Sequence, residues 1–226
     1  MKPLSIQIIT THTNAHIQKS ILETWLRNFS DYCFYTDFTT GIGNQLELTT
    51  NCAVDSGGEK HILNLQRIHR EKLCNQYEWF YFCDDDTVPN IRLILDFLNT
   101  ADKSCVYGWW DHVYNDDKTL KSLSGGAGYL VSGEILSKYS PPNLKRIIWG
   151  DVQFSIWVRE NGIPIVTVPE NATHSTTKFK WDMPHKHGID LSTISGVEQI
   201  RNTMSFHYVK DNTLREIITS IYETTP

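Results

Sequence analysis

The sequence predicts an α/β fold with a mostly parallel central sheet flanked by helices, and three observations carry this prediction. First, an alternating stretch at 4–10 is followed by a polar turn and by apolar residues at helical spacing, as at the opening of a Rossmann-like unit. Second, strand-like and helix-like stretches then alternate along the chain, at 15–29, 33–37, 61–74, 79–83, 90–100 and 105–108. Third, the apolar run at 79–83 passes directly into three carboxylates, as a buried strand does when it ends at a ligand site.

The predicted helices each present one apolar face. Over 15–29 the apolar side chains recur every three or four residues, and Gly57-Gly58 interrupts the chain before the same spacing returns at 61–74. A charged segment at 114–121 is expected to form a loop. We expect the remaining elements as follows: a short strand at 46–51, a helix at 134–139, a helix that begins at 149–152 and closes at 161–162, a last strand at 163–168, and a terminal helix at 214–222.

Length and composition indicate one globular domain over 1–226. The 40% hydrophobic and 21% charged residues are ordinary for a folded protein of 226 residues. A net charge of −5 provides no basic field, so we do not expect nucleic-acid binding. The sequence shows neither an apolar run long enough for a membrane helix nor a signal-peptide core, so we expect a soluble chain. The 5 cysteines lack zinc-ligand spacing and are expected to be reduced.

Three consecutive carboxylates, Asp84, Asp85 and Asp86, form the first candidate site. Adjacent carboxylates repel one another, so a fold keeps them together when a cation or several hydrogen-bond donors offset that repulsion. A hard divalent ion held by oxygen ligands is the natural partner. The alternative is a solvated Asp-rich turn in which Pro89 stops the strand. The apolar run before the acids and the helical stretch after them favour a site.

A glycine-rich run and a single acid provide two further candidates. Gly125, Gly126 and Gly128 precede a short apolar run, and glycine allows positive φ or the close approach of a backbone or ligand. The spacing matches neither a P-loop nor a dinucleotide fingerprint. Asp151 stands at the start of a helix, where it is either the N-cap or a catalytic acid. This stretch alone favours the N-cap.

Five blocks of sequence occur in an order that covers most of the chain: Glu23-Thr24-Trp25, Phe34-Tyr35-Thr36-Asp37, Trp79-Phe80 with Asp84-Asp85-Asp86, Gly125-Gly126-Ala127-Gly128-Tyr129, and Gly150-Asp151-Val152. This ordered set resembles the Fringe and core 1 β-1,3-galactosyltransferase group of nucleotide-sugar glycosyltransferases. The closing Ser205-Phe206-His207-Tyr208-Val209 looks more like the core 1 branch. The resemblance implies a GT-A fold and an inverting transfer of a hexose or N-acetylhexosamine from a UDP-sugar to a glycan or glycoprotein hydroxyl, forming a β-1,3 linkage.

The resemblance also implies roles for individual residues. The cofactor is expected to be Mn²⁺, or Mg²⁺, held by Asp84, Asp86 and His174. The family's metal-binding His lies in a short Phe-His block, which Thr173-His174-Ser175 matches without the Phe, and His207 is the alternative ligand. Asp151 corresponds to the family's catalytic Asp and would act as the general base. The donor is expected to contact Asp84, Asp85, Thr10, Thr11, Gly126, Ala127 and Gly128.

Several alternatives remain at this point. A catalytically inactive UDP-sugar or carbohydrate-binding module would keep the same fold, and a metal-dependent phosphohydrolase would use an Asp cluster to position water. Four tryptophans either stack on sugar faces or pack in the core: Trp109, Trp110, Trp149 and Trp181. Relatives usually carry a membrane anchor and a stem. We expect a cytoplasmic or otherwise soluble protein, or a Golgi-lumenal one if the chain is a trimmed domain.

Overall fold

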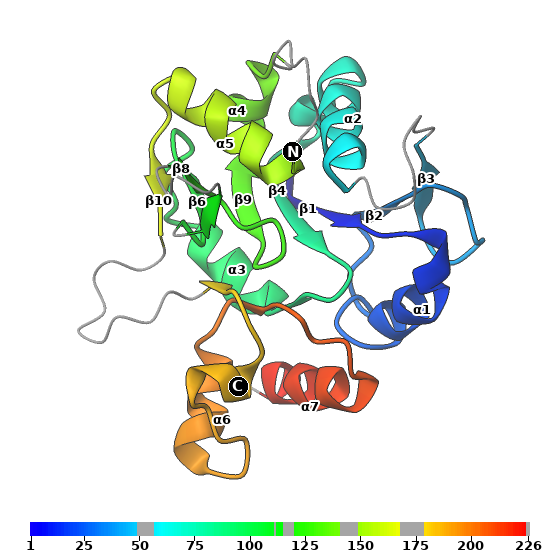
Figure 1. Cartoon of the computed structure of the whole chain (residues 1–226), viewed down its shortest axis with the longest axis vertical. Coiled ribbons are helices and arrows are strands. Elements are labelled where there is room, and N and C mark those ends of the chain that lie inside the picture. Colours follow the sequence, from blue (N-terminus) through cyan, green and yellow to red (C-terminus); the bar gives the residue numbers. More distant parts are fainter. Residues whose placement is uncertain (49–56, 111, 115–119, 141–148, 168–178, 225–226) are drawn as a thin grey trace.

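The computed structural model describes residues 1–48, 57–110, 112–114, 120–140, 149–167 and 179–224. Its centre is a seven-stranded sheet in the order β10-β6-β9-β4-β1-β2-β3 (Figure 1). The strands of this sheet are β1 (Lys2–Ile9), β2 (Tyr32–Thr36), β3 (Gln45–Glu47), β4 (Tyr77–Asp84), β6 (Val106–Gly108), β9 (Tyr129–Ser132) and β10 (Ile165–Val166). Each neighbouring pair is parallel except the two pairs that β9 makes, with β4 and with β6.

Two small sheets accompany the central one. β5 (Val88–Pro89), β11 (Phe179–Lys180) and β12 (Ser205–Phe206) form a three-stranded sheet with β12 in the middle. β7 (His112–Tyr114) and β8 (Leu120–Ser122) form an antiparallel pair. The helices are α1 (Ala15–Glu23), α2 (Gly57–Arg70), α3 (Ile91–Leu98), α4 (Gly133–Ser137), α5 (Gly150–Glu160), α6 (Ile194–Arg201) and α7 (Asn212–Glu223), with three short 3-10 turns, η1 (His12–Asn14), η2 (Leu73–Asn75) and η3 (Pro184–His187).

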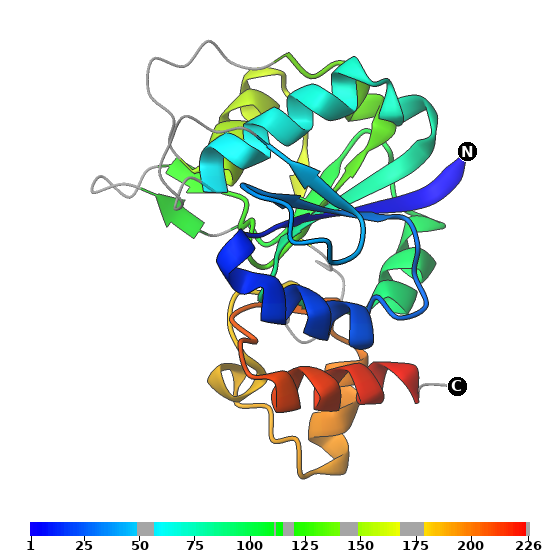
Figure 2. The same ribbon diagram turned by 90° about the vertical axis from the view of Figure 1, so that its right-hand side faces the viewer.

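The central sheet separates two hydrophobic cores. Along β4, Trp79 and Tyr81 point to one face, and Phe80 and Phe82 point to the other, as the period of two in a strand requires. The first core also receives side chains from α1, α3 and α7, and the second receives them from α2, α4 and α5. Figure 2 shows α2 on one side of the sheet and α1 on the other, with α7 packed beneath α1. This arrangement confirms the predicted α/β fold with a mostly parallel central sheet flanked by helices.

Several predicted boundaries differ from the structure. α1 ends at Glu23 rather than at 29, because Thr24 leaves helical geometry and its hydroxyl donates to the carbonyl oxygen of Ser20. The predicted loop at 114–121 is flanked by β7 and β8, so the ends of that stretch belong to strands. The stretch after 163–168 was expected to be a tail without strands, yet it contains β11, α6 and β12. Among the helices in the described residues, none is both long and apolar enough to cross a membrane.

Candidate functional site

The reversed direction of β9 determines which loops meet at the edge of the sheet. Residues that follow a parallel strand lie at its carboxyl edge, and residues that precede an antiparallel neighbour lie at the same edge. Phe82 in β4 pairs with Tyr129 in β9, so the acids after β4 lie next to the glycine-rich run before β9. Two stretches that the sequence singled out separately therefore share one site.

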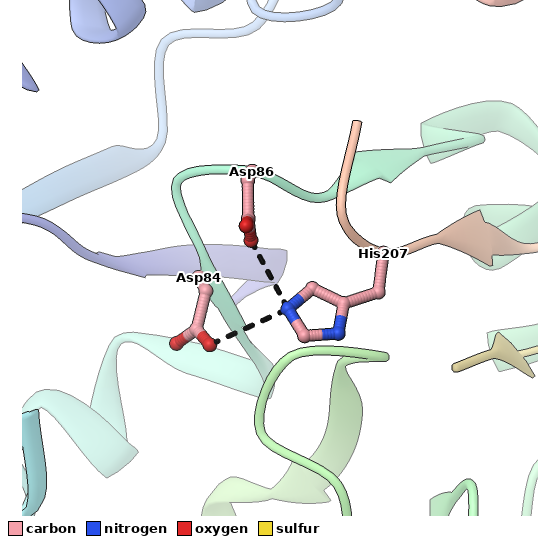
Figure 3. Close-up of side chains that lie close together, drawn as sticks. All are labelled: Asp84, Asp86 and His207. Carbon is pink, nitrogen blue, oxygen red and sulfur yellow. Dashed lines mark ion pairs between the residues drawn. The ribbon is translucent and has the colours of Figure 1, made fainter. Parts of the chain in front are cut away.

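Asp84, Asp86 and His207 converge at this edge. Their candidate ligand atoms all lie within 4.8 Å of one another. The Nε2 atom of His207 is 3.1 Å from Oδ1 of Asp86 and 3.8 Å from Oδ2 of Asp84 (Figure 3). His207 directly follows β12, and the antiparallel pairing of β12 with β5 brings it to the acidic turn. The amide of Val209 also donates to the carbonyl oxygen of Asp86 over 2.8 Å.

The orientation of the His207 ring suits a metal ligand. Its Nδ1 lies 3.2 Å from the carbonyl oxygen of Trp181, so a proton on Nδ1 makes a hydrogen bond and Nε2 presents a lone pair to the two carboxylates. The ring of Tyr208 stacks on the imidazole at a centroid distance of 3.8 Å, and the Trp181 ring packs against its edge at 5.1 Å. A lone pair facing two carboxylates is stable when a cation lies between them, so the donor set fits a divalent ion.

The electrostatics of Asp84 lead to the same conclusion. Lost hydration raises the pKa of Asp84 to about 7, and the charges of Asp86, Asp151 and Asp85 add to the rise. The side chain is 42% exposed, so solvent can still reach the carboxylate from one side. A cation at this position would remove the repulsion and keep Asp84 ionised.

Asp85 faces away from this cluster. Its carboxylate accepts hydrogen bonds from the hydroxyl of Thr10 over 2.5 Å and from the side-chain amide of Asn14 over 2.8 Å. These bonds tie the acidic turn to the residues after β1, so Thr10 supports the site through Asp85. Thr11 lies beside it, and its hydroxyl is 2.7 Å from that of Thr13. The predicted donor contacts of these residues stay predictions.

The glycine-rich run packs against the site's own side chains. A Cβ atom on Gly126 would lie 2.0 Å from Cε1 of His207, and one on Gly128 would lie 2.1 Å from the hydroxyl of Tyr81. Gly128 also has a φ of +85°, a left-handed conformation that favours glycine. Ala127 between them is fully buried, and its carbonyl oxygen accepts from the hydroxyl of Ser205. At Gly126 the close approach is made by the imidazole of His207, and the predicted donor contacts of Gly126, Ala127 and Gly128 stay predictions.

Asp151 lies in the first turn of α5, whose N-cap is Trp149, so the N-cap interpretation of Asp151 is wrong. Its Oδ2 accepts from the amide of Gly125 over 2.7 Å, and its Oδ1 accepts from the amide of Val152 over 2.8 Å. Two amide donors at a helix N-terminus favour the ionised carboxylate. Because its charge contributes to the raised pKa of Asp84, Asp151 also lies within electrostatic range of the cluster of Asp84, Asp86 and His207. Its predicted role as a base stays a prediction.

Of the other predicted residues, His174 lies outside the described residues. Trp181 contacts His207 and Tyr208, Trp149 is 56% exposed beside Asp151, and Trp109 and Trp110 are half-buried against the two cores. Trp181 therefore contacts the candidate site, and the predicted stacking of the four tryptophans on sugar faces stays a prediction.

Sequence reasoning missed two residues that contact the acidic turn. Arg215 in α7 is fully buried, and its Nη2 donates to the carbonyl oxygen of Val209 over 2.8 Å and to that of Asp85 over 3.4 Å. Lys210 places its ammonium 3.8 Å from Oδ2 of Asp86. Both occur in the C-terminal stretch, and their spacing gives no motif that could have identified them.

No protein-family model matches the chain, and no curated protein matches it. Among solved structures, it is similar to the crystal structure of a glycosyltransferase involved in the glycosylation of the major capsid of PBCV-1. That similarity has a TM-score of 0.46 at 12% identity and covers 96% of this chain and 99% of the other. A likeness at this level does not establish a function, so the assignment rests on the site itself.

Proposed function

We propose that this protein is a metal-dependent glycosyltransferase of the GT-A type that moves a hexose or N-acetylhexosamine from a UDP-sugar to a hydroxyl of a glycan or glycoprotein. The observation that carries this proposal is the convergence of Asp84, Asp86 and His207 within 4.8 Å at the carboxyl edge of a mostly parallel sheet. The ordered sequence blocks that resemble the Fringe and core 1 group support the UDP-sugar donor, inversion and a β-1,3 linkage.

The three side chains suit Mn²⁺ first and Mg²⁺ second, because one imidazole nitrogen joins two carboxylates. When bound, such an ion offsets the negative charge that the diphosphate gains as it leaves. The protein supplies the geometry. Asp84 and Asp86 face the ion position, Trp181 orients His207 through its carbonyl oxygen, and Asp85 anchors the turn to the residues after β1.

Asp151 is the base in this proposal. Inversion requires the acceptor hydroxyl to attack the anomeric carbon on the side opposite the leaving UDP. The new carbon–oxygen bond forms while the bond to the phosphate oxygen breaks, and the hydroxyl proton passes to the Asp151 carboxylate. The amides of Gly125 and Val152 keep that carboxylate ionised before the reaction.

UDP release with and without an acceptor tests the proposal. A thermal-shift screen of UDP-sugars with Mn²⁺ first selects the donor that stabilises the protein most. A glycosyltransferase releases UDP from that donor in an acceptor-dependent reaction that EDTA abolishes. A phosphohydrolase attacks the donor without acceptor, and an inactive binding module leaves it intact, so either outcome excludes the proposed function.

A further inference from the structure

A pocket apart from the candidate site is lined by residues of β11, η3 and α6. Its volume is about 540 Å³, which lies within the range of roughly 300–1,000 Å³ of small-molecule sites. Lys180 and His187 line it together with Ser195, Glu198, Gln199 and Asn202 from α6 and the residue that follows it. The pocket is separate from the cluster described above, because its lining includes none of Asp84, Asp86 and His207.

Lys180 is the unusual feature of this pocket. The residue is only 7% exposed, and among the described residues its ammonium group has neither a hydrogen-bond acceptor nor an acidic partner. Burial of most of this side chain removes part of the hydration that stabilises an ammonium group. Burial accordingly lowers the pKa of Lys180. A fold that keeps a lysine in this position leaves a cationic group available to an anion that enters the pocket.

His187 provides a second buried polar atom beside it. Its Nε2 is buried and has no hydrogen-bond partner among the described residues. Burial, followed by the nearby charge of Lys180, lowers the pKa of His187, and the backbone and charge of Asp182 oppose this shift. The residues from α6 that line the opening are exposed and polar, namely Ser195, Glu198 and Gln199. The pocket thus has an ammonium group and an imidazole nitrogen in its interior, and a polar rim that includes the carboxylate of Glu198.

We propose that this pocket binds the oxyanion group of a small molecule, a carboxylate or a phosphate, with Lys180 as its counter-charge and His187 as a second polar contact. An oxyanion accepts the hydrogen bonds that the Lys180 ammonium lacks among the described residues, and it offsets the desolvation of that group. A hydroxyl next to the oxyanion could donate to Nε2 of His187. The carbonyl oxygen of Lys180 accepts from the amide of His207 over 3.2 Å, so the backbone at this pocket is bonded directly to that of His207.

Titrations with two probes, inorganic phosphate and glycolate, test this proposal on the full chain. The measurements are isothermal titration calorimetry and thermal melting at constant ionic strength, without divalent ions or nucleotide sugar. We expect saturable binding of at least one probe by the wild type, and a loss of about tenfold or more in Lys180→Met. The tighter-binding probe identifies phosphate or carboxylate as the natural group. Because neither metal nor donor is present, the result does not depend on the proposed transferase activity.

Lys186→Met is the matched control, because Lys186 is exposed, stands next to His187 in η3 and carries the same charge. It should bind the probes as the wild type does. Lys180→Met should melt at or above the wild-type temperature without probe, since it removes a buried charge, and Lys180→Gln repeats the comparison with a polar side chain. Absence of saturable binding in the wild type, or equal binding in the two Lys180 variants and the wild type, overturns the proposal.

Discussion

The acidic turn divides its three carboxylates between two tasks. Asp84 and Asp86 face His207, whereas Asp85 accepts hydrogen bonds from Thr10 and Asn14. This division explains how adjacent acids coexist: the outer two share a place for a cation, and the middle one is held by neutral donors. At the scale of single residues, we therefore expect substitutions of Asp84 or Asp86 to affect metal binding, and substitutions of Asp85 to affect the support of the turn.

Comparing UDP affinity with and without Mn²⁺ identifies which side chains are metal ligands. Asp86→Ala and His207→Ala should weaken UDP binding at least tenfold in Mn²⁺ and leave it nearly unchanged in EDTA, because the ion bridges protein and diphosphate. Calorimetric titration of UDP under both conditions measures this. His174→Ala is the comparison that decides between the two candidate histidines. Normal Mn²⁺ dependence in His207→Ala together with a loss in His174→Ala would restore the assignment to His174.

The substitution Asp151→Asn removes the proton acceptor but keeps the size and most of the shape of the side chain. The amide side chain can still accept one hydrogen bond from Gly125 or Val152, but it cannot take up the acceptor's proton. We expect turnover to fall by ~10²- to 10⁴-fold with little change in UDP-sugar affinity. Steady-state kinetics and donor titration measure the two effects, and Asp190→Asn, at a surface turn outside the site, is the control. Turnover within about threefold of wild type would remove Asp151 from the catalytic role.

At the scale of elements, the sequence predicted what local patterns determine. The apolar run before Asp84 identified β4, and the helical spacing after Asn90 identified α3, which Asn90 caps by accepting from the amide of Leu93. The end of α1 was missed because apolar spacing continues past Thr24, where the backbone already turns away. β11 and β12 have two residues each, and pairing with distant strands rather than local pattern defines them. Only that pairing brings His207 to Asp84 and Asp86, so the spacing of residues in the sequence could not identify His207 as the histidine beside these acids.

α7 should influence the site although it contributes no ligand. Arg215 bonds the carbonyl oxygens of Val209 and Asp85, which belong to the two segments that carry the metal ligands. Arg215→Met should destabilise the protein by about 1–3 kcal/mol, because buried acceptors lose their donor. It should also weaken Mn²⁺-dependent UDP binding, because the two segments lose their common support. Urea unfolding and UDP titration measure both effects, with the exposed Glu216→Gln as control. Wild-type metal dependence in a destabilised Arg215→Met would limit Arg215 to the fold.

At the scale of the whole molecule, a buried histidine should make stability depend on pH. His61 in α2 is 2% exposed and hydrogen-bonds to the hydroxyl of Tyr129, and burial lowers its pKa to about 3. In the unfolded chain the pKa is about 6.5. Between these values the unfolded state binds the extra proton, so the free energy of unfolding falls as the pH falls from 6.5 toward 3.

The size of this effect is up to about 1.4 kcal/mol per pH unit. Urea unfolding of the wild type and of His61→Gln at pH 7, 6 and 5 isolates it from the other titrating groups. The variant should be less stable at pH 7 because of lost packing, and the difference from the wild type should shrink as the pH falls. Parallel curves would show that His61 is not the buried group responsible.

The metal cluster also joins segments that lie far apart in the chain. Asp84 and Asp86 follow a strand of the central sheet, whereas His207 belongs to the C-terminal part beside α6 and α7. An ion held by all three side chains would act as a reversible cross-link between these segments, and it would stabilise the folded state because it binds that state and not the unfolded chain. Removing the ion would then loosen the C-terminal part first, so the metal supply would set the lifetime of the folded protein against proteolysis as well as its catalysis.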